Sequence, residues 1–261
     1  MNLGLLSFFA RLVNRYLSLL GLRIKRTSPY ENFIFPVESD EFEKLSVLNA
    51  EKYSMTPLER LWALTYACKH ILTKNIPGDF VECGVWKGGN LILMSALIKY
   101  HGGDKKIYGF DTFSGMTEPT DIDKDLWGES AKSLLSRSEY KDGKASFYAF
   151  ASKELVSQIL IENGCVDVKL IEGDVLSTLH DKKNLPSSIS VLRLDTDWYE
   201  STRIELEVLY PLLVPGGILI IDDYGHFSGA RKAVDEYFKD ERPFMFHVDY
   251  SCRMIIKEEK S

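Results

Sequence analysis

Carboxylates recur at the ends of five short apolar runs in this chain of 261 residues. Ligands of open α/β sheets bind outside the carboxyl ends of the strands, where the tips of parallel strands meet. The pattern therefore predicts an acidic site at one edge of a sheet. The five runs end at Glu82-Cys83-Gly84, Asp111-Thr112, Glu172-Gly173-Asp174, Asp195-Thr196-Asp197 and Asp222-Asp223.

The first three of these ends could hold an adenosine. The turn after Glu82 carries Gly84 and Gly88 but lacks the glycine spacing of a dinucleotide fingerprint, so we expect no pyrophosphate there. Asp111 is placed to bind the two hydroxyls of a ribose, and Asp174 to accept from an adenine amino group. An adenosine without a phosphate site favours S-adenosylmethionine, whose sulfonium and amino groups are cationic and suit an acidic pocket.

The last two ends predict a metal site. Asp195 ends one strand and the pair Asp222-Asp223 ends another, so three carboxylates should converge. Unpaired, that density of negative charge is costly. Mg²⁺, which prefers oxygen ligands, would balance it. The alternative is capping of the following helix by Asp223 or Ser228.

The elements that would position these residues alternate between strand and helix, as in a doubly wound α/β domain. We expect strands starting near 78, 106, 166, 188 and 217, and helices over 90–100, 152–163, 201–213 and 230–238. Two final runs, 244–250 and 253–257, should pair antiparallel at an edge. The predicted fold is a seven-stranded, mostly parallel sheet with an antiparallel C-terminal edge.

Three segments fall outside this alternation. Residues 1–27 form an amphipathic pattern with a basic face, interrupted too often by arginine to span a membrane. Residues 1–26 could lie on an anionic membrane surface or dock on protein, including a second copy in a homo-oligomer. Residues 28–75 should form an N-terminal helical cap on a catalytic domain over 76–261. Residues 117–150 are a long polar insertion typical of a lid.

Composition narrows the class of partner and the compartment. Lys+Arg 32 against Asp+Glu 38 gives a net charge of −6, which argues against binding nucleic acid. The four cysteines have no zinc or disulfide spacing, so a reducing cytoplasm is expected, with contact to the inner membrane face through the N-terminal helix.

Together the motifs resemble the family of macrocin and mycinamicin sugar O-methyltransferases. The resemblance covers about residues 51–238 and rests on Tyr53-Ser54-Met55-Thr56, GDFVECGVWKGG, YGFDTFSGM, EGD, LRLDTDWYEST and LVPGGILIIDDYG. It implies a class I (Rossmann-like) methyltransferase fold and an S-adenosylmethionine- and Mg²⁺-dependent transfer to a sugar hydroxyl. It also implies that the Tyr53–Thr56 segment closes over the site. The chain departs from the family pattern at Ser54 and Thr196, and the insertion has no histidine.

Two sets of site residues follow. The residues predicted to hold Mg²⁺ are Asp195, Asp222 and Asp223. The residues predicted to bind the cofactor are Tyr53, Met55, Thr56, Glu82, Gly84, Val85, Trp86, Gly88, Asp111, Thr112, Ser114, Gly115, Asp174 and Val175.

Catalysis would need a base, because a sugar hydroxyl is a poor nucleophile at neutral pH. The candidates are His226, three residues after Asp223, and Asp197, which continued strand extension would place on the opposite face from Asp195. An acceptor with a vicinal diol could bind the metal through both oxygens. Trp127, in the insertion, is a candidate platform for the sugar.

Two other functions compete with this hypothesis. Asp195-Thr196-Asp197 is formally the DxD motif of a metal-dependent glycosyltransferase, although that enzyme would not need the glycine turn with Asp111. A non-catalytic module that only binds S-adenosylmethionine is the second alternative, and the retained carboxylates argue against it.

Overall fold

The structure is a computed structural model that describes residues 34–138, 141–143 and 145–259. The chain divides into two units, residues 1–39 and residues 40–261. In the described part of the first unit, Ser39 closes a turn by donating its hydroxyl to the Pro36 carbonyl. The predicted amphipathic helix lies outside the described residues, so its role stays a prediction. Among the described residues, no helix is long and apolar enough to cross a membrane.

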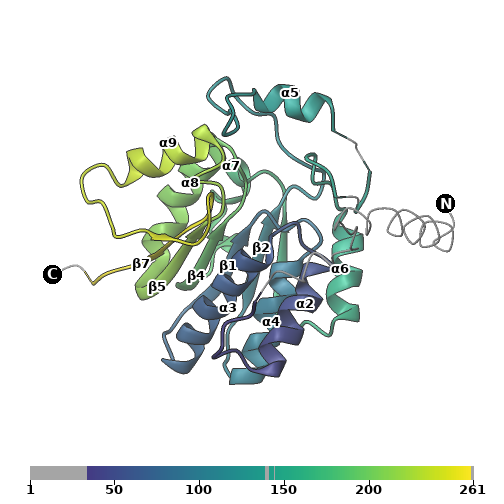
Figure 1. The fold of residues 1–261 in the computed structure, drawn as a ribbon, viewed down its shortest axis with the longest axis vertical. Coiled ribbons are helices and arrows are strands. Elements are labelled where there is room, and N and C mark those ends of the chain that lie inside the picture. The colour runs from purple at the N-terminus through teal and green to yellow at the C-terminus, as the bar shows by residue number, and fades with distance from the viewer. Residues whose placement is uncertain (1–33, 139–140, 144, 260–261) are drawn as a thin grey trace, which may run out of the picture. The chain divides into compact units, whose positions relative to one another are not determined.

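A seven-stranded sheet forms the centre of the larger unit (Figure 1). Its order is β3-β2-β1-β4-β5-β7-β6, with β7 antiparallel to its neighbours β5 and β6 and the other pairs parallel. The predicted α/β class and the antiparallel C-terminal edge are confirmed. The strands are β1 (Asp79–Cys83), β2 (Ile107–Asp111), β3 (Val168–Glu172), β4 (Ile189–Leu194), β5 (Leu213–Ile221), β6 (Phe246–His247) and β7 (Arg253–Ile256).

Helices cover both faces of the sheet. One layer holds α2 (Glu41–Glu51), α3 (Leu58–Thr73), α4 (Gly89–His101) and α6 (Lys153–Glu162). The other holds α7 (Val175–Thr178), α8 (Tyr199–Leu209) and α9 (Ser228–Tyr237), and Figure 1 shows α2, α3 and α4 together on the face nearer the viewer. Two short 3₁₀ turns, Lys182–Asn184 and Tyr210–Leu212, lie elsewhere in the chain.

The alternation of side chains along the strands decides which layer each one meets. Val81 and Cys83 pack in a buried apolar cluster with Leu206 and Leu209 of α8. Successive residues of a strand point to opposite faces, so Glu82 turns toward the layer of α3 and α4. A charged side chain on that buried face must find partners within the protein.

Two helices of the predicted N-terminal cap pack closely in the layer that covers the sheet. Helices α2 and α3, which fall within residues 28–75, belong to the same compact unit as the sheet. The reason is burial: Leu61, Leu64 and Ile71 of α3 are at most 1% exposed, and α3 packs against α4, β4 and β5. Helices α2 and α3 are therefore part of the wall of the domain.

The insertion is anchored on the main body through its first half. Asp123 is fully buried and accepts from the Tyr199 backbone N–H at the start of α8 (2.9 Å). Ser228, at the start of α9, donates its backbone N–H to the Lys124 carbonyl (2.9 Å). A short helix, α5 (Ala131–Ser136), follows, and Ala131 packs with Trp198 and Phe227 in a small apolar cluster. This part of the insertion is built into the fold.

Candidate active site

A cavity of about 280 Å³ opens where β1, β2, β4 and β5 end. Most of the predicted site residues line it. From the cofactor set these are Met55, Thr56, Gly84, Val85, Trp86, Asp111, Thr112, Gly115, Asp174 and Val175, and from the metal and catalytic sets Asp195, Asp197, Asp222 and His226. Lining residues that the sequence did not single out include Asn90, Phe110, Phe147, Ser201 and Phe227.

Gly84 lets two strand tips meet beneath this cavity. Its φ is +88°, and a Cβ built on it would lie 1.9 Å from the carbonyl oxygen of Asp195. The backbone N–H of Asp195 in turn donates to the Cys83 carbonyl (2.9 Å). Any side chain at position 84 would force the end of β1 away from the end of β4.

Asp111 ties the end of β2 to the turn after β1. Its Oδ2 accepts from the backbone N–H groups of Val85 (2.7 Å) and Trp86 (3.0 Å), and its Oδ1 from that of Phe113 (2.7 Å). These bonds aim the carboxylate and shape both loops, so Asp111 has a structural role beside the predicted contact with ribose. Asp174 also caps α7, with Oδ1 accepting from the Leu176 N–H (2.9 Å).

Four residues of the predicted cofactor set do not line the cavity. Tyr53 contributes a carbonyl that accepts from Gly89 N–H (3.1 Å), and Gly88 faces α6, close to Leu160. Ser114 is exposed. The fourth, Glu82, is fully buried behind the cavity wall. Their predicted contact with the cofactor therefore stays a prediction.

The buried Glu82 carboxylate forms an ion pair with Arg193 of β4. Arg193 lies beside Glu82 in the register of the sheet and is 1% exposed. Its Nη1 donates to Glu82 (2.8 Å) and Asp195 (2.6 Å), and its Nη2 to Asp222 (2.6 Å) and the Thr56 hydroxyl (3.1 Å). Sequence analysis missed this residue, although an arginine inside an apolar strand is a signal for a buried ion network.

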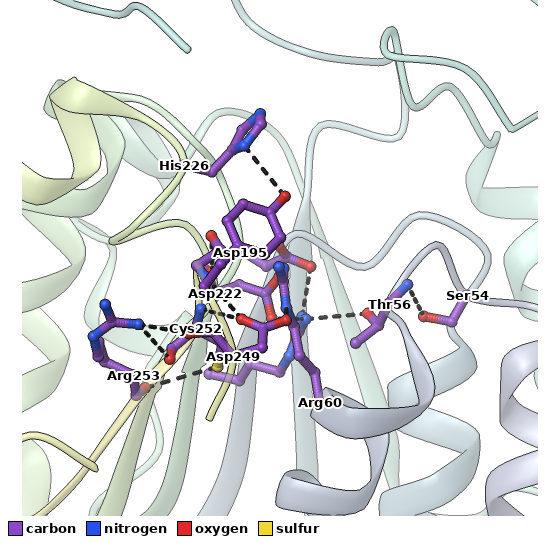
Figure 2. A network of polar contacts seen from close by, with 12 residues as sticks. Ser54, Thr56, Arg60, Asp195, Asp222, His226, Asp249, Cys252 and Arg253 are labelled. Carbon is purple, nitrogen blue, oxygen red and sulfur yellow. Dashed lines mark hydrogen bonds and ion pairs between the residues drawn. The ribbon is translucent and has the colours of Figure 1, made fainter. Parts of the chain in front are cut away.

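A second arginine, Arg60 of α3, extends this network toward the cavity mouth. It donates to Asp222 Oδ2, and its Nε donates to Asp249 Oδ2 (2.7 Å). Figure 2 shows Arg60 rising from its helix toward Asp222, with Ser54 and Thr56 on the loop that precedes the helix. Both oxygens of Asp222 are therefore engaged by arginines.

The carboxylates that come together are a different trio from the predicted one. Oxygens of Asp195, Asp197 and Asp223 lie within 4.8 Å of one another. Asp197 has a φ of +67°, so the chain turns back after β4 instead of continuing the extension that would separate Asp197 from Asp195. This trio includes Asp197 and lacks Asp222, whose two carboxylate oxygens are held by Arg60 and Arg193.

The chemistry of this trio fits a hard divalent cation. Burial, the largest cause, together with the neighbouring carboxylates raises the pKa of Asp195 to about 8 and of Asp197 to about 6, and the pKa of Asp223 rises well above its usual range. Three crowded acidic oxygens are what Mg²⁺ recruits in proteins. The buried indole N–H of Trp86, which lines the cavity, has no acceptor among the described residues and could donate to an acceptor atom of a ligand.

His226 lines the same cavity from the loop between β5 and α9. Its Nδ1 lies 3.3 Å from the Tyr250 hydroxyl. Partial burial lowers the pKa of His226, so the ring is neutral at physiological pH. A neutral imidazole whose Nδ1–H donates to Tyr250 leaves Nε2 free to take a proton.

Comparison with known proteins decides the family. The model of the macrocin O-methyltransferase (TylF) family matches residues 43–255. The chain belongs to this family. It is 31% identical over 221 residues to the 8-demethyl-8-(2,3-dimethoxy-alpha-L-rhamnosyl)-tetracenomycin-C 4'-O-methyltransferase of Streptomyces olivaceus, covering 82% of this chain and 79% of the relative.

Two further similar proteins support the assignment to this family. Mycinamicin III 3''-O-methyltransferase of Micromonospora griseorubida is 31% identical over 189 residues, which covers 71% of this chain and 70% of that enzyme. The solved structure of the O-methyltransferase NovP is 28% identical, with a TM-score of 0.67 over 79% of this chain and 83% of NovP. The chain is thus an O-methyltransferase, as its motifs indicated, and the glycosyltransferase alternative is wrong. Dependence on S-adenosylmethionine agrees with the family.

Proposed function

We propose that this macrocin-family enzyme transfers the methyl group of S-adenosylmethionine to a hydroxyl of a sugar, with the help of Mg²⁺. One observation carries the proposal: the residues suited to adenosine and the carboxylates suited to a cation line or adjoin the same cavity. The relatives add the acceptor class, since the tetracenomycin and mycinamicin enzymes are named for O-methylation of glycosylated products.

The cofactor would lie over the ends of β1, β2 and β3. Asp111 keeps lone pairs for the ribose hydroxyls beside the three backbone N–H groups that it accepts from. Asp174 is placed for the adenine, and Trp86 offers its buried N–H to an acceptor on the ligand. The acidic surroundings favour the cationic sulfonium form over the neutral thioether product.

Mg²⁺ would be held by Asp195, Asp197 and Asp223, and when bound it supplies Lewis-acid polarisation of the acceptor hydroxyl. Arg193 fixes the direction of Asp195 through the 2.6 Å bond between them. An acceptor with a vicinal diol could offer two oxygens to this site. Holding the reacting oxygen in line with the methyl group would provide much of the rate enhancement.

His226 would accept the proton of the reacting hydroxyl on Nε2. The oxygen forms its bond to the methyl carbon as the carbon–sulfur bond breaks, and the electron pair of that bond stays on sulfur. Tyr250 holds the ring through Nδ1 at 3.3 Å. Asp197, the other candidate base, shares its cluster with Asp195 and Asp223, so we assign it to the cation.

The test is turnover on defined glycosides. The purified chain is incubated with S-adenosylmethionine, MgCl₂ and a panel of methyl and p-nitrophenyl glycosides of hexoses and 6-deoxyhexoses, and products are analysed by mass spectrometry. We expect a product heavier by one CH₂ group, lost in EDTA and restored by excess Mg²⁺. Asp223→Asn should abolish it, whereas Asp121→Asn, at a fully exposed carboxylate, should not. Methylation that persists in EDTA would refute the role of the metal.

A further inference from the structure

Two exposed aromatic side chains stand beside His226. Trp127 is 78% exposed, and its ring centroid lies 5.8 Å from that of His226. Tyr250 is 55% exposed, and its ring centroid lies 5.9 Å from the same imidazole. His226 lines the cavity, whereas the two aromatic rings do not. Both rings therefore lie just outside the cavity, and each is next to His226, which lines it.

Trp127 is held in place by the anchored half of the insertion. Asp125 is buried, and its Oδ1 accepts from the backbone N–H groups of Trp127 (3.0 Å) and Glu129 (2.8 Å). The adjacent Lys124 N–H donates to the Ser228 hydroxyl (3.0 Å) at the start of α9. The backbone that carries the indole is thus fixed relative to the cavity, while the indole itself faces solvent.

Tyr250 is held from the opposite end of the sequence, in the turn between β6 and β7. The preceding Asp249 accepts from the backbone N–H groups of Ser251 (2.8 Å) and Cys252 (2.7 Å) and from Arg60 Nε (2.7 Å). The Arg60 guanidinium lies 5.7 Å from the centroid of the Tyr250 ring. The same arginine contacts Asp222, so the support of this ring is continuous with the cavity wall.

Exposure of an aromatic side chain alone needs no explanation. Phe244 and Phe246 are 71% and 44% exposed, but they pack against each other at 4.8 Å and do not line the cavity. Trp127 and Tyr250 differ, because both contact a cavity residue and both are carried by anchored backbone. Tryptophan and tyrosine are enriched among the residues that dominate binding energy, and ligand cavities are lined mainly by apolar and aromatic side chains.

We propose that Trp127 and Tyr250 form an outer acceptor subsite, which binds an apolar aglycone ring attached to the methylated sugar. The inference rests on the proposed function, since it places the sugar inside the cavity near His226 and the aglycone outside it. Stacked or edge-to-face packing on the two rings would recognise a flat ring system. The subsite thus selects aryl or other ring-bearing glycosides over simple alkyl glycosides.

Selectivity in turnover is the first test. For wild type we expect kcat/KM to be higher for the p-nitrophenyl glycoside than for the methyl glycoside of the same sugar. Trp127→Ala should lower this ratio at least tenfold, mainly through KM for the aryl glycoside, and Trp127→Phe should restore part of it. Phe244→Ala, at an exposed aromatic that does not line the cavity, should leave the ratio unchanged. A ratio that Trp127→Ala leaves intact would overturn the subsite while the proposed function stands.

Binding is the second test and does not depend on turnover. The nitrophenyl group quenches indole fluorescence on contact, so titration of each p-nitrophenyl glycoside into the complex with S-adenosylhomocysteine should quench wild type. Most of this quenching should be lost in Trp127→Phe, and Tyr250→Ala should weaken the affinity at least fivefold. If none of the panel quenches wild type, the subsite is refuted. If quenching occurs without methylation of any glycoside, the subsite survives and the proposed function fails.

Discussion

Thermal unfolding can identify the third carboxylate of the cation site without an activity assay. Asp197→Asn and Asp222→Asn each remove one negative charge and preserve the size of the side chain. In the structure Asp197 belongs to the trio with Asp195 and Asp223, whereas Asp222 is held by two arginines. Asp222→Asn should therefore lower stability and keep the response to Mg²⁺, whereas Asp197→Asn should keep stability and lose that response.

The magnitudes follow from the burial of these contacts. Asp222 is 3% exposed, and its ion pairs with Arg60 and Arg193 are buried. Breaking a buried ion network costs about 3–5 kcal/mol, and each kcal/mol shifts Tm by about 2–4 °C at this domain size, so Asp222→Asn should lower Tm by roughly 6–20 °C. We expect a fall in the lower half of this range, because the amide oxygen of the asparagine at position 222 still accepts one hydrogen bond. Asp197→Asn should not lower Tm in EDTA, because it relieves crowding with Asp195 and Asp223.

The response to Mg²⁺ completes the design. A ligand present at about 100 times its Kd adds about 2.7 kcal/mol, or roughly 5–11 °C in Tm, if it binds only the folded state. Wild type, Asp222→Asn and the exposed control Asp121→Asn should show this rise between EDTA and MgCl₂ by scanning fluorimetry. Asp197→Asn should lose it. The opposite pattern, with the rise lost in Asp222→Asn and kept in Asp197→Asn, would restore the set predicted from sequence and return Asp197 to the role of base.

Four further outcomes are expected, which concern Glu205, His226 and Arg193. Burial raises the pKa of Glu205 to about 8 from an ordinary value of 4.5, so its stabilising contribution is complete below pH 4.5 and is lost as pH rises toward 8. In EDTA, the Tm of Glu205→Gln relative to wild type should therefore increase between pH 5 and pH 8, and an unchanged difference would contradict burial of the neutral acid. His226→Gln should lower kcat by about 10²–10⁴ with little change in S-adenosylmethionine affinity by calorimetry. In wild type kcat/KM should rise with pH through a pKa below 6.5, because the neutral imidazole is the active form and its pKa is lowered; an acid limb above 6.5 would contradict this. Arg193→Met should lower Tm by roughly 6–20 °C, whereas Arg203→Met, which breaks exposed pairs on α8, should change stability by less than about 1 kcal/mol.

Strand ends could be predicted because their chemistry depends on topology alone. Once the alternation of strands and helices indicates a parallel sheet, the carboxyl ends of the strands must meet at one edge. Asp111, Asp174 and Asp195 were placed at the cavity by that argument, and all three line it. The antiparallel pairing of the last two strands followed from their length and position, and the structure confirms it.

The direction of individual side chains could not be predicted in the same way. The sequence Asp195-Thr196-Asp197 does not specify the backbone φ of +67° at Asp197, which turns this residue back toward Asp195. Glu82 lies near a strand end like the other acids. Its side chain, however, is on the face of the sheet opposite that of Cys83, where it pairs with Arg193. Such partners are distant in the sequence, and the order of the residues alone does not reveal which of them will be in contact.

The distribution of charge around the cavity ties the structural and catalytic roles together. Arg60 and Arg193 form ion pairs with Glu82, Asp195, Asp222 and Asp249, so two positive charges of the protein balance half of that negative charge. Asp197 and Asp223 have no arginine or lysine partner among the described residues, and they adjoin Asp195 at the front. The unbalanced negative charge therefore lies beside the space where the reaction would occur. A sulfonium and a divalent cation would each reduce this excess of negative charge, which is why these acids suit the proposed chemistry.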